Sequence, residues 1–352
     1  MAPQSTPRRA PPALATLALA LAACGSGRPT APASAPEHLS ETGLYVDATS
    51  GRLAPGVRAF APQYPLWSDG ATKRRWVLLP EGATIDASDP EAWEFPIGTK
   101  FWKEFSFGRR VETRYMERVA DGSWLYATYL WPADGVEAVR APADGVRAFA
   151  TTEFGTPHDV PGVQDCRACH EGHPARVLGF SALQLSDERD PLAPHAEALP
   201  ENALTLAELL QRGLLAGVPA ELRSAARPIE AASPRERAAL GYLHANCGGC
   251  HNARGPLAGL GLELEYRRDT LAPALRSALG VPSAYQPEAG RAAQRIVAGD
   301  PAASVLTHRM GSRFGPTQMP PLGTHVLDSD ALALVQAWIL RDLAPAFAVA
   351  AH

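Results

Sequence analysis

The chain has 352 residues, of which 46% are hydrophobic and 20% are charged, a balance that can build one large globular domain or two smaller ones. Its formal net charge of -4 argues against a nucleic-acid-binding surface, which needs a basic excess. Beyond the first few dozen residues, no apolar run is long enough to span a bilayer.

The N-terminus is typical of an export signal. Two arginines precede a short apolar run, which predicts a signal peptide over residues 1–23. The run ends in Leu-Ala-Ala-Cys24, which resembles the lipobox of bacterial lipoproteins and implies cleavage before Cys24 and a diacylglyceryl group on its thiol. An ordinary signal peptide with an incidental cysteine is the alternative. We therefore expect an exported, periplasmic protein, anchored through lipid to the outer membrane, with a flexible tether over residues 24–40.

Residues 41–155 predict a β-rich domain. Short alternating runs are separated by Asp-Gly turn signals, which favours antiparallel strands. A sandwich is one arrangement that such strands adopt. The strand-like runs are Arg75–Leu79, Thr99–Phe107, Val111–Val119 and Trp124–Trp131.

Aromatic and basic side chains are concentrated in this β-rich region. Six of the seven tryptophans occur here, at Trp67, Trp76, Trp93, Trp102, Trp124 and Trp131. Aromatic residues in strands usually fill a core, and the alternative is an exposed platform for a carbohydrate or a redox partner. The basic residues are Lys73, Arg74, Arg75, Arg109 and Arg110. We expect them on a solvated face, with a docking patch as the alternative.

Four of the five cysteines form two pairs, each followed by a histidine. The motifs are Cys166-Arg-Ala-Cys169-His170 and Cys247-Gly-Gly-Cys250-His251. This is the haem-attachment pattern of c-type cytochromes, in which two thiols on one helical turn reach both vinyl groups of a porphyrin and the next residue offers an imidazole to the iron. Disulfides, or one zinc ion held by four thiolates, are the alternatives, but neither explains a histidine after both pairs. The sequence therefore predicts two covalently bound haem c groups, with His170 and His251 as iron ligands.

The region 233–352 predicts a mainly α-helical cytochrome c domain that carries the second haem. Ser233-Pro-Arg-Glu236 is a capping box, and the helix that follows it should deliver Cys247. A last helix should begin at Asp328 or Ser329. Its apolar face is formed by Leu332, Val335, Ile339 and Leu343.

A methionine between these two helices is the candidate sixth ligand of the second haem. Met319 is followed by two prolines on a loop before the last helix, which resembles the axial methionine of class I cytochromes c. A thioether ligand favours ferrous iron and raises the reduction potential. Met310 is the second choice, and packing in the core is the ordinary role of a methionine.

The segment 156–232 should hold the first haem on Cys166, Cys169 and His170. Its sixth ligand is not readable from the sequence. His173 is too close to His170 to reach the opposite face of a porphyrin. The remaining candidates are His158, His195, His308, His325, Met116 and Met310. An open sixth position, which could bind a small ligand, is the alternative.

Several stretches resemble a bacterial family of dihaem c-type cytochrome lipoproteins. They are Leu39–Gly43, Tyr64–Pro80, Phe95–Phe105, Glu112–Arg118 and the QMPPLG segment, together with the two haem motifs. The resemblance covers nearly all of the mature chain. It implies electron transfer in the periplasm or at the cell surface, with redox partner proteins as donor and acceptor and no settled substrate.

We therefore expect an electron carrier rather than an enzyme. One alternative is a dihaem redox enzyme such as a peroxidase. The other is a carbohydrate-binding or scaffold protein that carries haems for a partner dehydrogenase.

Overall fold

The chain divides into two compact units, Met1–Ala33 and Ser34–His352. The computed structural model describes Met1 and residues 34–90, 92–223, 228–267, 273–287 and 293–344. The expected signal peptide, the lipidated Cys24 and most of the tether therefore lie outside the described residues. Among the residues that are described, no helix has the length and apolar character needed to cross a membrane.

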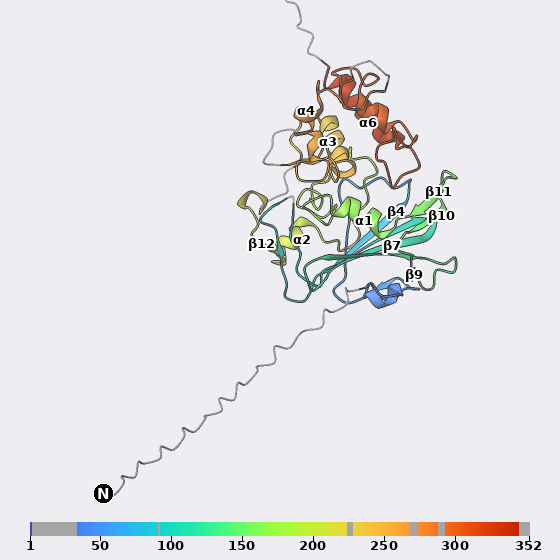
Figure 1. The fold of residues 1–352 in the computed structure, drawn as a ribbon, viewed down its shortest axis with the longest axis vertical. Coiled ribbons are helices and arrows are strands. Elements are labelled where there is room, and N and C mark those ends of the chain that lie inside the picture. The colour runs from blue at the N-terminus through green and yellow to red at the C-terminus, as the bar shows by residue number, and fades with distance from the viewer. Residues whose placement is uncertain (2–33, 91, 224–227, 268–272, 288–292, 345–352) are drawn as a thin grey trace, which may run out of the picture. The chain divides into compact units, whose positions relative to one another are not determined.

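A six-stranded antiparallel sheet forms the centre of the β-rich region, as predicted (Figure 1). Its strand order is β3-β4-β6-β7-β8-β9. The strands are β3 (Arg58–Phe60), β4 (Thr72–Leu78), β6 (Lys100–Phe107), β7 (Arg109–Arg118), β8 (Trp124–Leu130) and β9 (Val139–Arg140). The four strand-like runs of the sequence thus correspond to β4, β6, β7 and β8.

The remaining strands form only two-stranded pairs among the described residues. They are β1 (Tyr45–Asp47) with β2 (Arg52–Leu53), β10 (Val146–Thr151) with β11 (Pro157–Val160), and β5 (Ile85–Asp86) with β12 (Leu215–Ala216). The β-rich region is thus confirmed, but the second extended sheet that a sandwich needs is not found among the described residues. The segments that cover the large sheet are short and rich in proline and glycine, which favours loops over a second sheet.

Side chains alternate between the two faces of the large sheet. One face, which we call the motif face, packs against the segment that follows the first Cys-x-x-Cys-His motif. Its buried apolar residues are Phe60, Val77, Phe101, Met116, Trp124 and Tyr126, which pack with Val177, Phe180 and Leu185. Burial of these large side chains is the main stabilising contribution on this face.

The opposite face is covered by the start of the unit, including the 3-10 turn η1 (Leu39–Thr42). Its buried aromatic residues are Trp76, Trp102, Tyr115 and Tyr129. All six tryptophans of region 41–155 are buried, with at most 9% of their surface exposed. The prediction that strand aromatics fill a core is confirmed, and an exposed tryptophan platform is excluded.

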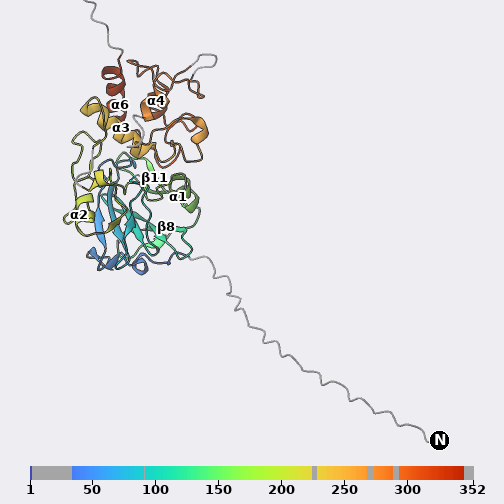
Figure 2. The ribbon, with the colours of Figure 1, turned by 90° about the vertical axis from the view of Figure 1, so that its left-hand side faces the viewer.

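The described helices are short and lie mainly in the second half of the chain (Figures 1 and 2). They are α1 (Val163–His170), α2 (Leu206–Gln211), α3 (Pro234–Asn246), α4 (Pro273–Ala278), α5 (Val305–Met310) and α6 (Ser329–Arg341). The expectation of a mainly α-helical region 233–352 is not supported, because long loops join α3 to α6. Glycine and proline recur in the loops over 253–261 and 311–323, which prevents regular helix there.

Helices α3 and α6 pack against each other at the positions that their capping signals predict. The Ser233 hydroxyl accepts a hydrogen bond from the Glu236 amide at 3.0 Å, and Asp328 caps α6. Val335 and Ile339 are fully buried, together with Trp338, whose indole donates to Glu236 Oε2 at 3.1 Å. The same core also contains Tyr64 and Leu183, so the helices share a core with earlier parts of the chain.

Candidate functional site

The second Cys-x-x-Cys-His motif continues directly from α3. Cys247 is the C-terminal cap of α3, and its amide donates to Leu243 O at 2.9 Å. The His251 amide donates to Cys247 O at 2.9 Å, so the motif forms one more helical turn. A glycine is required at 248, since a Cβ there would lie 2.6 Å from His244 O. This turn places both thiols and the imidazole on one short segment.

These three side chains line a cavity of about 220 Å³ together with Met319. The cavity wall also contains Met310, the second choice for an iron ligand. Its apolar lining includes Leu257, Leu260, Leu262, Leu264, Ala278, Val305 and Leu306. The structure thus brings together, from α3 and from the loop before α6, the four side chains that the sequence assigned to the second haem.

The nitrogen and sulfur atoms of this motif are in a desolvated environment. Burial raises the pKa of the Cys247 thiol to about 12, with a contribution from Cys250. Burial also lowers the pKa of His251, and its Nδ1 is buried with no hydrogen-bond partner among the described residues. At neutral pH the Cys247 thiol is therefore protonated and the His251 imidazole is neutral.

Three arginines, which sequence analysis did not identify, also line this cavity. Arg309 Nε donates to Thr317 O at 2.9 Å, Arg313 donates to Val326 O at 3.0 Å, and Arg295 donates to Gly261 O at 2.6 Å. Within the described part of the chain, none of the three forms an ion pair with a carboxylate. An apolar cavity bordered by unpaired guanidinium groups fits a large apolar molecule that carries carboxylates, as a porphyrin does.

The first motif lies on α1, which packs beside β8 (Figure 2). The Gly162 amide donates to the Asp165 carboxylate at 3.0 Å at the start of this helix. The imidazole of His170 lies 5.5 Å from the ring of Tyr126, measured between centroids, on the motif face. Cys166 packs against the hydrophobic core of that face. Helix α1 thus presents the first motif to the sheet.

A backbone carbonyl fixes the tautomer of His170. Its Nδ1 donates to Arg176 O at 2.7 Å, because a carbonyl can only accept. The proton is therefore on Nδ1, and Nε2 carries a free lone pair. Burial lowers the pKa of His170 to about 4, which keeps the imidazole neutral at physiological pH. A neutral imidazole whose Nδ1 donates to a backbone carbonyl is the usual form of a metal-ligating histidine.

The two motif segments lie against each other, although they are far apart in sequence. The Asn252 side chain is buried, and its amide donates to Gly248 O at 3.0 Å and to Gly172 O at 3.5 Å. His173 Nε2 lies 2.8 Å from Glu265 Oε1. Burial raises the pKa of the Cys169 thiol to about 11, and Cys250 adds to this shift. These contacts join the loop after the first motif to the loop after the second.

No protein-family model, curated protein or solved structure matches the chain.

The structure places the candidate sixth ligands of the first haem in different environments. His158, His195 and His325 lie within 3.2 Å of the carboxylates of Glu112, Asp328 and Asp159 respectively. His308 lies beside the ring of Tyr285, and Met310 lines the second cavity. Met116 is buried in the core against which Cys166 packs. The assignment of this ligand stays open.

The four cysteines of the two motifs form no disulfide with one another. The described residues contain no group of three or more His, Cys, Asp or Glu side chains placed to hold a metal ion.

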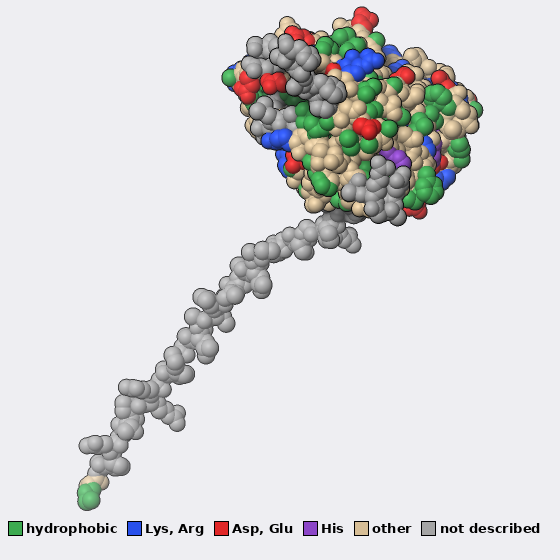
Figure 3. All heavy atoms as spheres, turned by 90° about the horizontal axis from the view of Figure 1, so that it is seen from above, with side chains coloured by type: hydrophobic (Ala, Val, Ile, Leu, Met, Phe, Trp, Pro, Cys, Tyr) green, Lys and Arg blue, Asp and Glu red, His purple; other side chains and the backbone are tan. Residues whose placement is uncertain are grey.

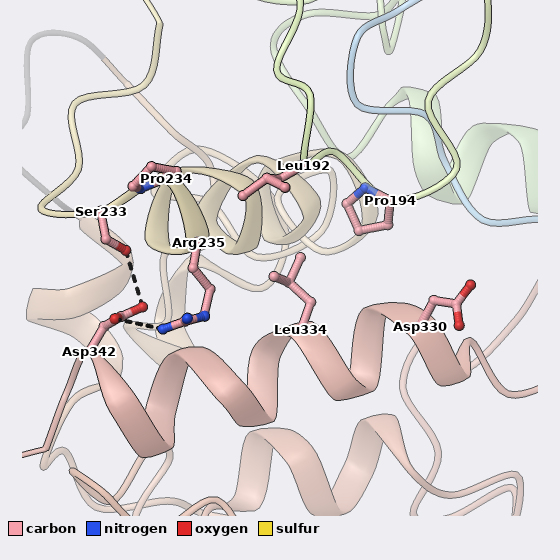
Figure 4. Close-up of a pocket in the computed structure, with 8 residues that line it drawn as sticks. All are labelled: Leu192, Pro194, Ser233, Pro234, Arg235, Asp330, Leu334 and Asp342. Atoms are coloured by element: carbon pink, nitrogen blue, oxygen red, sulfur yellow. Dashed lines mark hydrogen bonds and ion pairs between the residues drawn. The ribbon is translucent and has the colours of Figure 1, made fainter.

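A second hollow, of about 590 Å³, lies beside α3 and α6, where Arg235 and Ser233 contact Asp342 (Figure 4). It is lined by Leu192, Pro194, Ser233, Pro234, Arg235, Asp330, Leu334 and Asp342. No thiol, thioether or imidazole is among these residues, so it is not the site that the motifs form.

A buried histidine beside the second motif makes stability depend on pH. Burial lowers the pKa of His244 from 6.5 to about 4, and nearby His173 contributes, whereas Glu265 opposes the shift. Its Nδ1 accepts a hydrogen bond from the Tyr266 amide at 3.2 Å. Between pH 6.5 and about 4 the unfolded chain binds a proton here that the native chain does not. The native state therefore loses stability as the pH falls through this window.

Replacing His244 by asparagine is expected to reduce this pH dependence, since an amide oxygen can accept the same hydrogen bond without titrating. The midpoint of urea unfolding, measured at pH 7 and pH 4.5, should fall less in the variant than in the parent protein. The exposed His38→Asn serves as a control and should keep the parent's pH dependence. An unchanged difference between the two pH values in His244→Asn would contradict the assignment.

Proposed function

We propose that this protein carries two covalently attached haem c groups and transfers electrons in the periplasm or at the cell surface. The observation that carries this proposal is the cavity that joins Cys247, Cys250 and His251 to the thioether of Met319. The match between this donor set and the needs of a c-type haem supports the assignment. We assign the region 233–352 the role of a cytochrome c domain on the same ground.

Each motif supplies the same three groups to its haem. The thiols of Cys166, Cys169, Cys247 and Cys250 would form the thioether links. His170 and His251 would each present an imidazole nitrogen to an iron, and Met319 would present its sulfur to the second iron. A bound haem supplies an iron that cycles between the ferric and ferrous states. The apolar part of the second cavity's lining, together with a thioether ligand, would favour the ferrous state.

The contact between the two motif segments supports a relay of electrons between the haems rather than two independent sites. Asn252 donates to the Gly172 carbonyl and so joins the loops that follow the motifs. Burial raises the pKa of the Cys169 thiol, and Cys250 adds to this shift. Electrons could then pass from one haem to the other inside one chain. Redox partner proteins would act as donor and acceptor.

Export and anchoring belong to the same proposal. Haem c is attached outside the cytoplasm, and the expected signal peptide over 1–23 would deliver the chain there. A lipid on Cys24 would then hold the protein at the outer membrane.

Haem counting tests the proposal directly. The pyridine haemochrome assay is expected to give two haems per chain for the parent protein. One haem should remain in the double variant Cys166→Ser/Cys169→Ser, and one in Cys247→Ser/Cys250→Ser. No covalent haem should remain when all four cysteines are replaced.

The outcomes that contradict the proposal are equally clear. Exported parent protein without covalent haem would exclude it. A five-coordinate, high-spin haem that turns over peroxide would favour the dihaem enzyme over the electron carrier.

A further inference from the structure

The motif face carries a row of basic side chains across three neighbouring strands. Arg75 on β4, Lys103 on β6 and Arg114 on β7 are paired directly with one another in the sheet register. Lys73 lies two residues before Arg75 and so on the same face. The side chains of Lys73 and Arg75 are only 5% and 6% exposed, so the expectation of a solvated face is wrong for these two residues. It is confirmed for Arg74 and Arg109, which are exposed. Like charges directly opposite each other destabilise a sheet, so this row needs negative charge nearby.

Two carboxylates supply part of that charge. Glu197 forms an ion pair with Arg75 and lies 3.8 Å from Lys73 Nζ. Glu112 forms an ion pair with Arg114 at 2.6 Å and also faces His158. Lys103, at the centre of the row, has no hydrogen bond or ion pair within the described part of the chain. Its ammonium group only lies over the Phe105 ring, 4.8 Å from the centroid.

Several uncharged donors on the same face also lack partners. Thr128 pairs with Arg114 in the register, and Tyr126 lies two residues before it on β8. The hydroxyls of both residues are buried and have no hydrogen-bond partner among the residues that the structure describes, and the same holds for the indole nitrogen of Trp124. Buried polar groups in native proteins are nearly always hydrogen-bonded. An acceptor that this chain does not itself provide would satisfy them.

The row begins beside the first motif and runs away from it. Helix α1 packs on β8, and the neighbour of β8 in the sheet is β7, the strand that carries Arg114. Neighbouring strands are about 4.8 Å apart, so β4 lies roughly 14 Å across the face from β8. A flat, apolar molecule tethered at Cys166 and Cys169 could extend across the face toward Lys103. Haem has this form, with its two carboxylates at the edge of the ring opposite the vinyl groups.

We propose that Lys103 binds a propionate carboxylate of the haem attached at Cys166 and Cys169, with Lys73, Arg75 and Arg114 adding to the positive field. This inference rests on the proposed function. On the surface seen in Figure 3, by contrast, basic side chains are scattered among acidic and hydrophobic ones. The row of basic side chains on the motif face is therefore a specific arrangement, and a carboxylate of the cofactor completes its charge balance.

The test is a redox titration of the full-length, haem-loaded protein. A nearby cation favours the ferrous state, because the ferric haem carries one more positive charge. In Lys103→Met the ratio of ferrous to ferric haem at a fixed potential should fall about tenfold for one haem only, a shift of about 59 mV. Lys103→Arg should restore the parent value. Lys100→Met is the matched control, since Lys100 lies on the same strand but points to the opposite face, where it donates to Thr42 O at 3.0 Å.

The other outcomes decide for or against the inference. Equal potentials in the parent and in Lys103→Met would show that no cofactor charge is near Lys103. A change to high-spin iron in Lys103→Met would identify the amine as an iron ligand instead. Loss of the first haem from both the Met and the Arg variant would show that charge at 103 is not what matters, whereas loss from the Met variant alone supports the proposal. Absence of any covalent haem from the parent protein would instead be a failure of the proposed function.

Discussion

Replacing Met319 by alanine is expected to abolish the methionine-to-iron absorption band of the ferric protein and to lower the reduction potential of one haem. The thioether stabilises ferrous iron, and water or a stronger donor in its place would favour the ferric state. The shift should be on the order of 100 mV, a fraction of the ~0.8 V range over which axial ligands set haem potentials. Optical spectroscopy combined with a redox titration measures both effects on the same sample.

Met310→Ala provides the matched control for this experiment. Both methionines line the same cavity, so both substitutions remove a similar apolar volume beside the proposed haem. Only loss of the true ligand removes the band. If the band survives in Met319→Ala and is lost in Met310→Ala, the ligand assignment is reversed. If it survives in both, neither thioether binds the iron.

The second site could be predicted in large part because its signals are local. Capping residues fix the start of α3 at Ser233 and of α6 at Asp328, and α3 then carries Cys247 into place. Met319 lies on the loop that precedes α6, between these two helices in the sequence. The cavity arginines gave no such signal, because Arg295 and Arg309 reach the cavity only through long-range packing of α5 and its neighbouring loops.

The burial of side chains on the motif face, by contrast, could not be predicted from the sequence. The period of two places Lys73 and Arg75 on one face of a strand, but the sequence does not say which face is later covered. The cover comes from the segment after the first motif, about a hundred residues downstream. Lys73 and Arg75, which were expected in solvent, are therefore buried in the fold, whereas Arg74 between them is exposed. The same limit left the first haem's sixth ligand open, because every candidate depends on contacts between distant segments.

Replacing Gly255 by alanine is expected to push the two motif segments apart. A Cβ at this position would collide with the backbone carbonyl of Gly172 and would lie 3.1 Å from Asn252 Oδ1. A backbone atom cannot move aside as the end of a flexible side chain can. The loop carrying Gly172 or the loop carrying Gly255 must therefore shift. We expect a loss of stability of about 1–3 kcal/mol, as for other overpacked sites, measured by urea unfolding.

The control for this substitution is Gly259, four residues after Gly255 in the sequence. Gly259→Ala adds the same methyl group where no other atom lies within 4 Å, so its unfolding midpoint should match the parent. If the motif contact holds the two haems together, Gly255→Ala should also slow electron exchange between them after rapid reduction of one haem, while Gly259→Ala should not. Equal stability and equal exchange in both variants would mean that the segments are not in contact as described. A loss of stability with unchanged exchange would separate the two roles, because the contact would then support the fold without setting the path of the electron.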